Sequence, residues 1–267
     1  MKVAQMYEDE LHAYLPIEHE SLRFTPLPVK RLALYQAAKP AMELMLSSLP
    51  VRFVRMSWIE ALDALDREAA EQQMRTGYLG SILALLNETL QLNAFQNPNA
   101  LMLARDKEGK LSSIIVQQSQ GSPVVLGSSQ MDTIREILAA QNGYEIPDEN
   151  WNVELVRAQQ YLREQRSQGV GGSLEDAVCA LAAATGFRAK EIWNWPIREY
   201  LGAQNAVDRR LRFQIYTAAE MSGQVKFKNG NPYPTWIAVP KGLPTGFKSL
   251  KELDDGANGL LPVPQDK

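Results

Sequence analysis

Histidine and cysteine are scarce in this sequence, and their scarcity limits the chemistry that the chain can perform. The chain holds one cysteine, Cys179, so it cannot form an internal disulfide. Its two histidines, His12 and His19, share a helical spacing, but no cysteine or spaced set of carboxylates joins them. We therefore interpret them as surface residues rather than metal ligands. No serine stands in the sequence context of a nucleophile elbow. The sequence thus predicts no enzyme, no cofactor and no metal site.

Long apolar runs and a large charge excess are also missing. No stretch approaches the ~20 apolar residues that span a bilayer, and the N-terminal residues lack the basic start and apolar run of a signal peptide. We expect a cytosolic protein with no membrane partner. The formal net charge is −3, whereas nucleic-acid-binding domains are usually basic, so nucleic acid is not the favoured partner. Apolar residues make up 45% of the chain, enough for a hydrophobic core.

Two local features could be mistaken for reactive sites. The stretch Gly169-Val170-Gly171-Gly172 precedes a helical pattern, as a phosphate-binding loop does, but it follows another helical pattern instead of a strand and has no Lys-Ser/Thr ending. Cys179 belongs to a helical stretch of small apolar residues, and no histidine neighbours it in sequence. We predict a flexible linker at the glycines and a buried, unreactive thiol at Cys179.

The N-terminal part of the chain is predicted to be mostly helical. Apolar residues recur at helical spacing between Lys30 and Leu49, where Pro40 is expected to divide the helix or to lie in a first turn. Residues 51–56 alternate apolar and basic side chains, which predicts a short strand. Ser57 is expected to begin a helix, with Glu60 completing a capping box. Further helices are expected over residues 82–92, 131–141 and 151–166.

The period of the pattern changes to two near residue 101, which predicts strands. Two strands flank a charged turn in which Gly109 is expected to take a positive φ, and a third strand follows at Pro123. The predicted fold class is therefore α+β, mostly α-helical, with a small antiparallel β-meander near residues 101–126. From Asn229 onward, repeated proline and glycine predict an extended C-terminal tail.

We divide the chain into an α+β domain over residues 1–166, a glycine-rich linker at 167–172, a helical domain over 173–228 and a tail over 229–267. Inside the helical domain, Ser173 is expected to cap a first helix that stops at Gly186. A restart is expected at Pro196, because proline costs no hydrogen bond in a first turn. The last helix is expected to end at Ser222-Gly223.

Aromatic and basic side chains concentrate in and after this helical domain, and they form a candidate partner-binding surface. Its members are Trp193, Trp195, Tyr200, Arg209, Arg210, Arg212, Phe213, Lys226, Phe227 and Trp236. The helices between Leu174 and Leu201, followed by the arginines, leave open an alternative function as a nucleic-acid-binding, helix-turn-helix-like regulator. Against it, the second helix carries tryptophan in place of a row of polar side chains that would contact bases.

A series of short motifs follows in order over residues 130–238. The motifs are Ile134-Arg135-Glu136-Ile137, Gln141-Asn142, Trp151, Ser173-Leu174-Glu175-Asp176, Ala184-Thr185-Gly186, Ile192-Trp193, Ile197-Arg198-Glu199-Tyr200, Ala219-Glu220-Met221-Ser222-Gly223, Val225-Lys226 and Pro234-Thr235-Trp236. In this order they resemble the tail assembly chaperones and tail-region proteins of bacteriophages. The chain departs from the family's usual pattern at Pro196, where threonine is usual, and at Thr235, where histidine is usual.

The resemblance implies a non-enzymatic protein of phage tail morphogenesis, either an assembly chaperone or a structural component of the tail. The expected partners are other tail proteins, namely the tape measure or tail tube subunits, or a second copy of the chain. The expected location is the host cytoplasm during assembly, or the tail of the virion. Such a chaperone would bind amphipathic helical segments, which requires an exposed apolar surface that accepts a helix.

Overall fold

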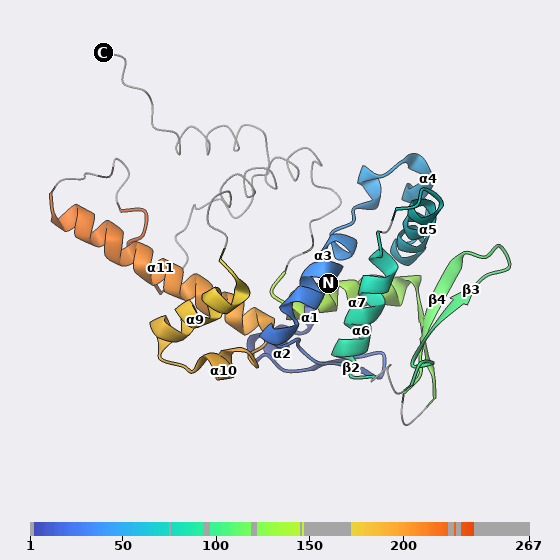
Figure 1. Ribbon diagram of the computed structural model, residues 1–267, viewed down its shortest axis with the longest axis horizontal. Coiled ribbons are helices and arrows are strands. Elements are labelled where there is room, and N and C mark those ends of the chain that lie inside the picture. The colour runs from blue at the N-terminus through green and yellow to red at the C-terminus, as the bar shows by residue number, and fades with distance from the viewer. Residues whose placement is uncertain are drawn as a thin grey trace, which may run out of the picture. The chain divides into compact units, whose positions relative to one another are not determined.

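The computed structural model describes residues 3–74, 76–92, 97–118, 122–144, 146, 172–223, 227 and 231–237. These residues form a mostly helical α+β protein with small antiparallel sheets, which confirms the predicted fold class (Figure 1). The predicted helix over 151–166 and the predicted linker, except Gly172, lie outside the described residues. Of the predicted tail, only residues 231–237 are described.

Two compact units make up the chain, and the first is discontinuous in sequence. It combines Met1–Ile146 with Lys190–Leu201, whereas the second combines Pro147–Ala189 with Gly202–Lys267. This division differs from the predicted one, because the segment Lys190–Leu201 was assigned from the sequence to the C-terminal helical domain.

Backbone pairing explains why Lys190–Leu201 belongs to the first unit. The amide of Val29 donates to the carbonyl of Trp195 at 2.9 Å, and the amide of Ile197 donates to the carbonyl of Leu27 at 2.8 Å. Between them, Pro28 and Pro196 form an antiparallel bridge. Proline favours extended backbone and lacks a donor, so these positions pair through their neighbours.

Short elements open the first unit. Helices α1 (Val3–Met6) and α2 (Glu8–His12) precede the antiparallel strands β1 (Ile17–His19) and β2 (Leu22–Phe24). The 3-10 helix η1 (Val29–Arg31) then leads directly into α3 (Leu32–Met42), and η2 (Leu46–Ser48) follows it.

Pro40 does not divide the helix α3, and that prediction is wrong. Pro40 lies in the last turn of α3, where its missing N–H removes one hydrogen bond. Packing against the rest of the first unit stabilises this turn, because Ala38, Ala41 and Met42 are fully buried. In addition, the indole N–H of Trp58 donates to the carbonyl of Ala41 at 2.9 Å.

The predicted strand over residues 51–56 is also wrong, because Val51–Val54 form the single helical turn α4. Its alternating pattern does not correspond to alternating burial. Phe53 is buried, whereas Val51 and Val54 are 77% and 50% exposed. Pro50 is extended and precedes the turn directly, which suits the start of a helix.

The helices α5 (Trp58–Glu71) and α6 (Tyr78–Thr89) begin at two kinds of cap. The capping box of α5 is confirmed: the amide of Ser57 donates to Glu60 Oε2 at 2.7 Å, and Ser57 Oγ accepts from the amide of Glu60. Helix α6 begins before the predicted start at Ile82. The carboxylate of Asp66, on α5, accepts from the amides of Tyr78 and Leu79 at 2.9 Å each and so caps α6 from another helix.

The predicted β-meander is confirmed. Strands β3 (Leu101–Arg105), β4 (Leu111–Val116) and β5 (Val124–Gly127) pair antiparallel in the order β3-β4-β5. Gly109 takes the expected positive φ, of 78°, in the turn between β3 and β4. Strand β5 leads into α7 (Ser128–Gln141), whose predicted end at Asn142-Gly143 is confirmed.

The core of the first unit lies among α3, α5, α6 and α7, with one face of β4 against α5. Its largest fully buried side chains include Trp58, Phe24, Phe53, Ile59, Leu62, Ile82, Leu85 and Leu86. Arg135 enters this core from α7. Its guanidinium lies over the ring of Trp58 and donates to the carbonyls of Met42 and Leu44 at 2.7 and 2.8 Å. These contacts satisfy a buried cation.

The helix α9 (Leu174–Thr185) lies in the second unit and begins and ends as predicted. Ser173 and Asp176 form a capping box, and Gly186 ends the helix with a φ of 81°. The prediction of a buried Cys179 is wrong, because the thiol is exposed. The buried stripe of α9 is narrow and consists of Val178 and Leu181. A residue next to Val178 points about 100° away from it around a helix.

The helix α10 (Ala189–Ile192) is followed by the long helix α11 (Ile197–Met221). The predicted start of α11 at Pro196 and its end before Ser222-Gly223 are confirmed. Residues of α11 up to Leu201 belong to the first unit, and the rest belong to the second.

Candidate functional site

The aromatic residues predicted at the start of the site are packed into the first unit. Tyr200 is 2% exposed, and Trp193 and Trp195 are half-buried. The carbonyls of both tryptophans accept hydrogen bonds from the backbone of Val29 and Lys30. Burial raises the pKa of the Tyr200 hydroxyl. The buried Tyr200 side chain and the backbone of the two tryptophans therefore help to fasten Lys190–Leu201 to the first unit.

Two other predicted site residues, Arg212 and Phe227, belong to a group in the second unit that we call the Arg212 cluster: Asp208, Arg212, Tyr216, Phe227 and Tyr233. Arg212 Nε donates to Asp208 at 2.8 Å, and its Nη1 donates to the hydroxyl of Tyr233 at 3.2 Å. The ring of Tyr216 lies 5.4 Å from that of Phe227 and 5.1 Å from that of Tyr233, measured between centroids. Tyr233 is only 8% exposed. The cluster thus attaches the segment around Tyr233 to α11.

The remaining predicted residues do not form one site with these. Arg209 and Phe213 are half-buried, and Arg210 is exposed. Trp236 is 44% exposed. Lys226 lies outside the described residues. The structure therefore places the predicted set in separate groups, with Trp193, Trp195 and Tyr200 in one unit and the described remainder in the other.

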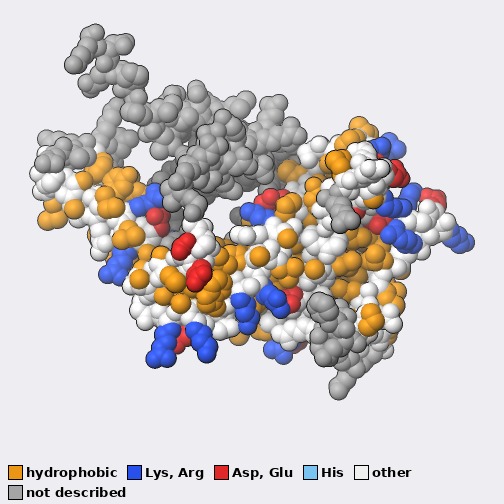
Figure 2. Space-filling view, in the orientation of Figure 1, with side chains coloured by type: hydrophobic (Ala, Val, Ile, Leu, Met, Phe, Trp, Pro, Cys, Tyr) orange, Lys and Arg blue, Asp and Glu red, His pale blue; other side chains and the backbone are white. Residues whose placement is uncertain are grey.

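Sequence reasoning missed a row of exposed apolar residues on α11, which we call the α11 apolar row: Leu211, Ile215, Ala218 and Met221. The three large side chains, Leu211, Ile215 and Met221, are 52%, 65% and 83% exposed. Successive spacings of three and four residues place the row along one side of the helix. Figure 2 shows hydrophobic side chains gathered at this end of α11. The spacing of Leu211 and Ile215 was the available signal, but the neighbouring arginines dominate the pattern.

Neither a cluster of metal-ligating side chains nor a membrane-spanning helix occurs among the described residues. Within the described ranges, no group of three or more His, Cys, Asp or Glu side chains is arranged to hold a metal ion. His19 Nδ1 lies 2.9 Å from the hydroxyl of Tyr7, with which it shares a hydrogen bond. No helix in the described part of the chain is both long enough and apolar enough to cross a bilayer.

The second unit thus combines a closed ion-pair and aromatic cluster with an uncovered apolar row on one long helix. Exposed rows of large apolar side chains are typical of protein-binding surfaces, because their burial against a partner is favourable. Comparison of the chain with protein-family models, with curated proteins and with solved structures found no match.

Proposed function

We propose that this chain is a non-enzymatic protein-binding component of bacteriophage tail assembly, acting as an assembly chaperone or as a structural protein of the tail. The observation that carries the proposal is the α11 apolar row, whose large side chains are all more than half exposed. The motif Ala219-Glu220-Met221-Ser222-Gly223, on which the resemblance to phage tail proteins partly rests, contains Met221, the last residue of this row.

The chemistry of the row fits a helical partner. Fully burying one Leu, Ile or Met side chain contributes about 1.5–3 kcal/mol. The row recurs at the helical period, so an amphipathic helix laid along α11 would cover it with its own apolar face. The arginine and acidic side chains on neighbouring faces of α11 would remain at the polar rim of such an interface.

The test is co-expression with the tape measure and tail tube proteins of a phage that encodes this chain, followed by pull-down at low salt. We expect the wild-type chain to retain one of them. The triple variant Leu211→Ser, Ile215→Ser, Met221→Ser should lose at least about 90% of the retained partner, because three anchors of the interface are gone. The variant's circular dichroism should match the wild type.

A matched control is the double variant Val51→Ser, Val54→Ser, which removes equally exposed apolar side chains from α4 in the first unit. This control should bind as the wild type does. No retention by the wild type, or equal retention by the triple variant, would contradict the proposal. A concentration-dependent mass in light scattering, abolished by the triple variant, would identify a second copy of the chain as the partner.

A nucleic-acid-binding regulator is the second candidate function, and it is supported by the basic residues on α11 that follow the helices between Leu174 and Leu201. Arg212 is engaged by Asp208 and Tyr233, whereas Arg209 and Arg210 form no ion pair with an acid among the described residues. The triple variant Arg209→Ala, Arg210→Ala, Arg212→Ala should reduce salt-dependent retention on DNA if this candidate holds. We expect no retention of the wild type at physiological salt.

A further inference from the structure

We propose that the first unit holds a binding site for a small multivalent oxyanion of the pyrophosphate class. The site is a hollow of about 250 Å³ lined by Arg52, Arg55, Met56, Glu60, Ala64, Arg67 and Lys110. The lining thus contains four cations and one carboxylate. This inference does not depend on the proposed role in tail assembly, because it concerns the other unit of the chain.

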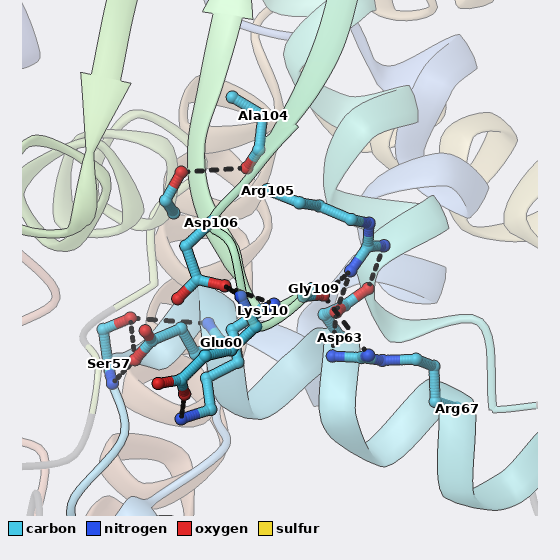
Figure 3. Close-up of polar contacts among 11 residues, drawn as sticks. Ser57, Glu60, Asp63, Arg67, Ala104, Arg105, Asp106, Gly109 and Lys110 are labelled. Atoms are coloured by element: carbon cyan, nitrogen blue, oxygen red, sulfur yellow. Dashed lines mark hydrogen bonds and ion pairs between the residues drawn. The ribbon is translucent and has the colours of Figure 1, made fainter.

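Helix α5 and the turn between β3 and β4 bring two of the cations together. The carboxylate of Asp63 on α5 accepts hydrogen bonds from both Nη atoms of Arg105 on β3, at 2.7 and 2.8 Å (Figure 3). Arg105 also donates to the carbonyl of Gly109 in the turn, at 3.0 Å. These bonds fasten the turn to α5, so that Lys110 from the turn and Arg67 from α5 both line the hollow.

Acidic partners outside the lining hold three of the cations in position. Arg52 contacts Glu68 at 2.7 Å, Arg67 contacts Asp63 at 2.7 Å, and Lys110 contacts Glu108 at 2.6 Å. None of these carboxylates lines the hollow. A guanidinium has five N–H donors and an ammonium has three, so one carboxylate leaves donors of each cation unused.

Of the two other charged side chains of the lining, Glu60 carries a negative charge that opposes an anion, and Arg55 carries a positive charge that favours one. Glu60 Oε2 accepts from the amide and the hydroxyl of Ser57, at 2.7 and 2.9 Å, so its charge is engaged in the cap of α5. Arg55 is exposed, and no ion pair of its side chain is found among the described residues. Arg55 can therefore turn its donors to a ligand without giving up a partner.

Size and donor geometry select the class of ligand. A water molecule takes about 30 Å³ in the liquid, so the hollow holds several waters, but it is smaller than the ~300–1,000 Å³ of pockets that enclose drug-sized ligands. A compact anion fits better than a whole nucleotide. A planar guanidinium group can bind two oxygens of a phosphate at once, and the lining provides three such groups, from Arg52 in α4, Arg55 just after α4 and Arg67 in α5.

The test is calorimetric titration of the full chain with sodium pyrophosphate at constant ionic strength. We expect saturable binding with one site per chain. The double variant Arg55→Gln, Lys110→Gln should bind about tenfold more weakly or worse, because two charge-assisted contacts are lost. The variant Arg23→Gln removes an exposed arginine of the first unit outside the hollow, and it should bind within about twofold of the wild type, as an uninvolved charge would.

Two outcomes would overturn the inference: no saturable heat for the wild type, or equal weakening by Arg23→Gln. A third outcome, binding of a single-stranded oligonucleotide in the absence of pyrophosphate binding, would also overturn it and would assign the cations to a phosphodiester backbone. The thermal midpoint of each variant without ligand shows whether it is folded. If the double variant is unfolded, the single variant Arg55→Gln replaces it, because Arg55 is exposed.

Discussion

Asp63 is a nearly buried carboxylate held by two largely exposed arginines. The hydrogen bonds from Arg105 are the main cause that lowers the pKa of Asp63. The positive charges of Arg105 and Arg67 lower this pKa further, whereas burial acts in the opposite direction and raises it. Because the pKa of folded Asp63 lies below its ordinary value, this carboxylate stabilises the fold above about pH 4. That contribution is lost as the pH falls through the pKa of the folded state.

The variant Arg105→Ala should therefore destabilise the first unit at neutral pH and have little effect in acid. We expect a loss of about 1–2 kcal/mol in the free energy of unfolding at pH 7, since a hydrogen-bonded charge is left with one partner. The difference should shrink as the pH falls through the lowered pKa of folded Asp63, because the carboxyl is then protonated in both proteins. Urea unfolding across this pH range measures both values. A difference that is constant with pH would contradict the explanation.

Two glycines with positive φ differ in their surroundings, and this difference predicts unequal costs of substitution. A Cβ on Gly143 would lie 3.4 Å from Arg198 Cα, whereas one on Gly186 would meet nothing within 4 Å. Both would be strained by about 1–2 kcal/mol in the left-handed region. Gly143→Ala should thus lower the thermal midpoint more than Gly186→Ala. An equal loss of thermal midpoint in the two variants would mean that the backbone around Arg198 shifts to accommodate the added methyl group.

At the scale of elements, local caps and remote caps behave differently. The box of Ser57 and Glu60 lies within four residues of sequence, and it is visible as a motif. The cap of α6 comes from Asp66 on another helix. Local chemistry at Gly77, which is left-handed with no capping side chain, gives no comparable signal for the start of α6. The start of α6 is therefore set by the packing of α5 against α6.

The variant Asp66→Ala should loosen the start of α6. Two amides and the hydroxyl of Thr76 lose their acceptor, and we expect a cost of about 1–2 kcal/mol in unfolding free energy. Glu71→Ala, on the exposed end of the same helix, is the control and should change stability by less than about 0.5 kcal/mol. Faster hydrogen exchange at Leu79 in Asp66→Ala alone would support the remote cap, and unchanged exchange would exclude it.

At the scale of the whole molecule, Lys190–Leu201 completes the first unit from a distant part of the chain. Ile192, Ile197 and Tyr200 are buried, at 0%, 0% and 2% exposure. Each would contribute about 1.5–3 kcal/mol through burial. The extended stretch from Leu27 supplies the backbone partners that receive this segment.

A chain that ends at residue 188 should therefore have a less stable first unit than a chain that ends at residue 201. We expect a loss of several kcal/mol, from three buried side chains and the backbone bonds that accompany them. Hydrogen exchange of amides in α3 and α6 measures the stability of the unit in both chains. Equal protection of these amides in the two chains would show that Lys190–Leu201 does not stabilise the first unit.

The candidate surface could be predicted from the sequence only in part. Aromatic and basic residues around α11 were visible as a composition, but composition does not distinguish Tyr200, which is buried, from Trp236, which is exposed. The row from Leu211 to Met221 has the same helical spacing as a buried face would have. Whether such a row packs in the core or can bind a partner depends on its solvent exposure. That exposure is set by which other parts of the chain cover the helix.

The sequence by itself determined the features that depend on near neighbours. These include the mostly helical α+β class, the meander with Gly109 in its turn, the serine caps of α5 and α9, and the glycine that ends α9. Each follows from backbone preferences and hydrogen bonds a few residues apart. Tertiary structure alone decided the helical turn at Val51–Val54, the exposure of Cys179 and the return of Lys190–Leu201 to the first unit. These depend on burial and on bonds between distant residues, for which a local pattern carries no signal.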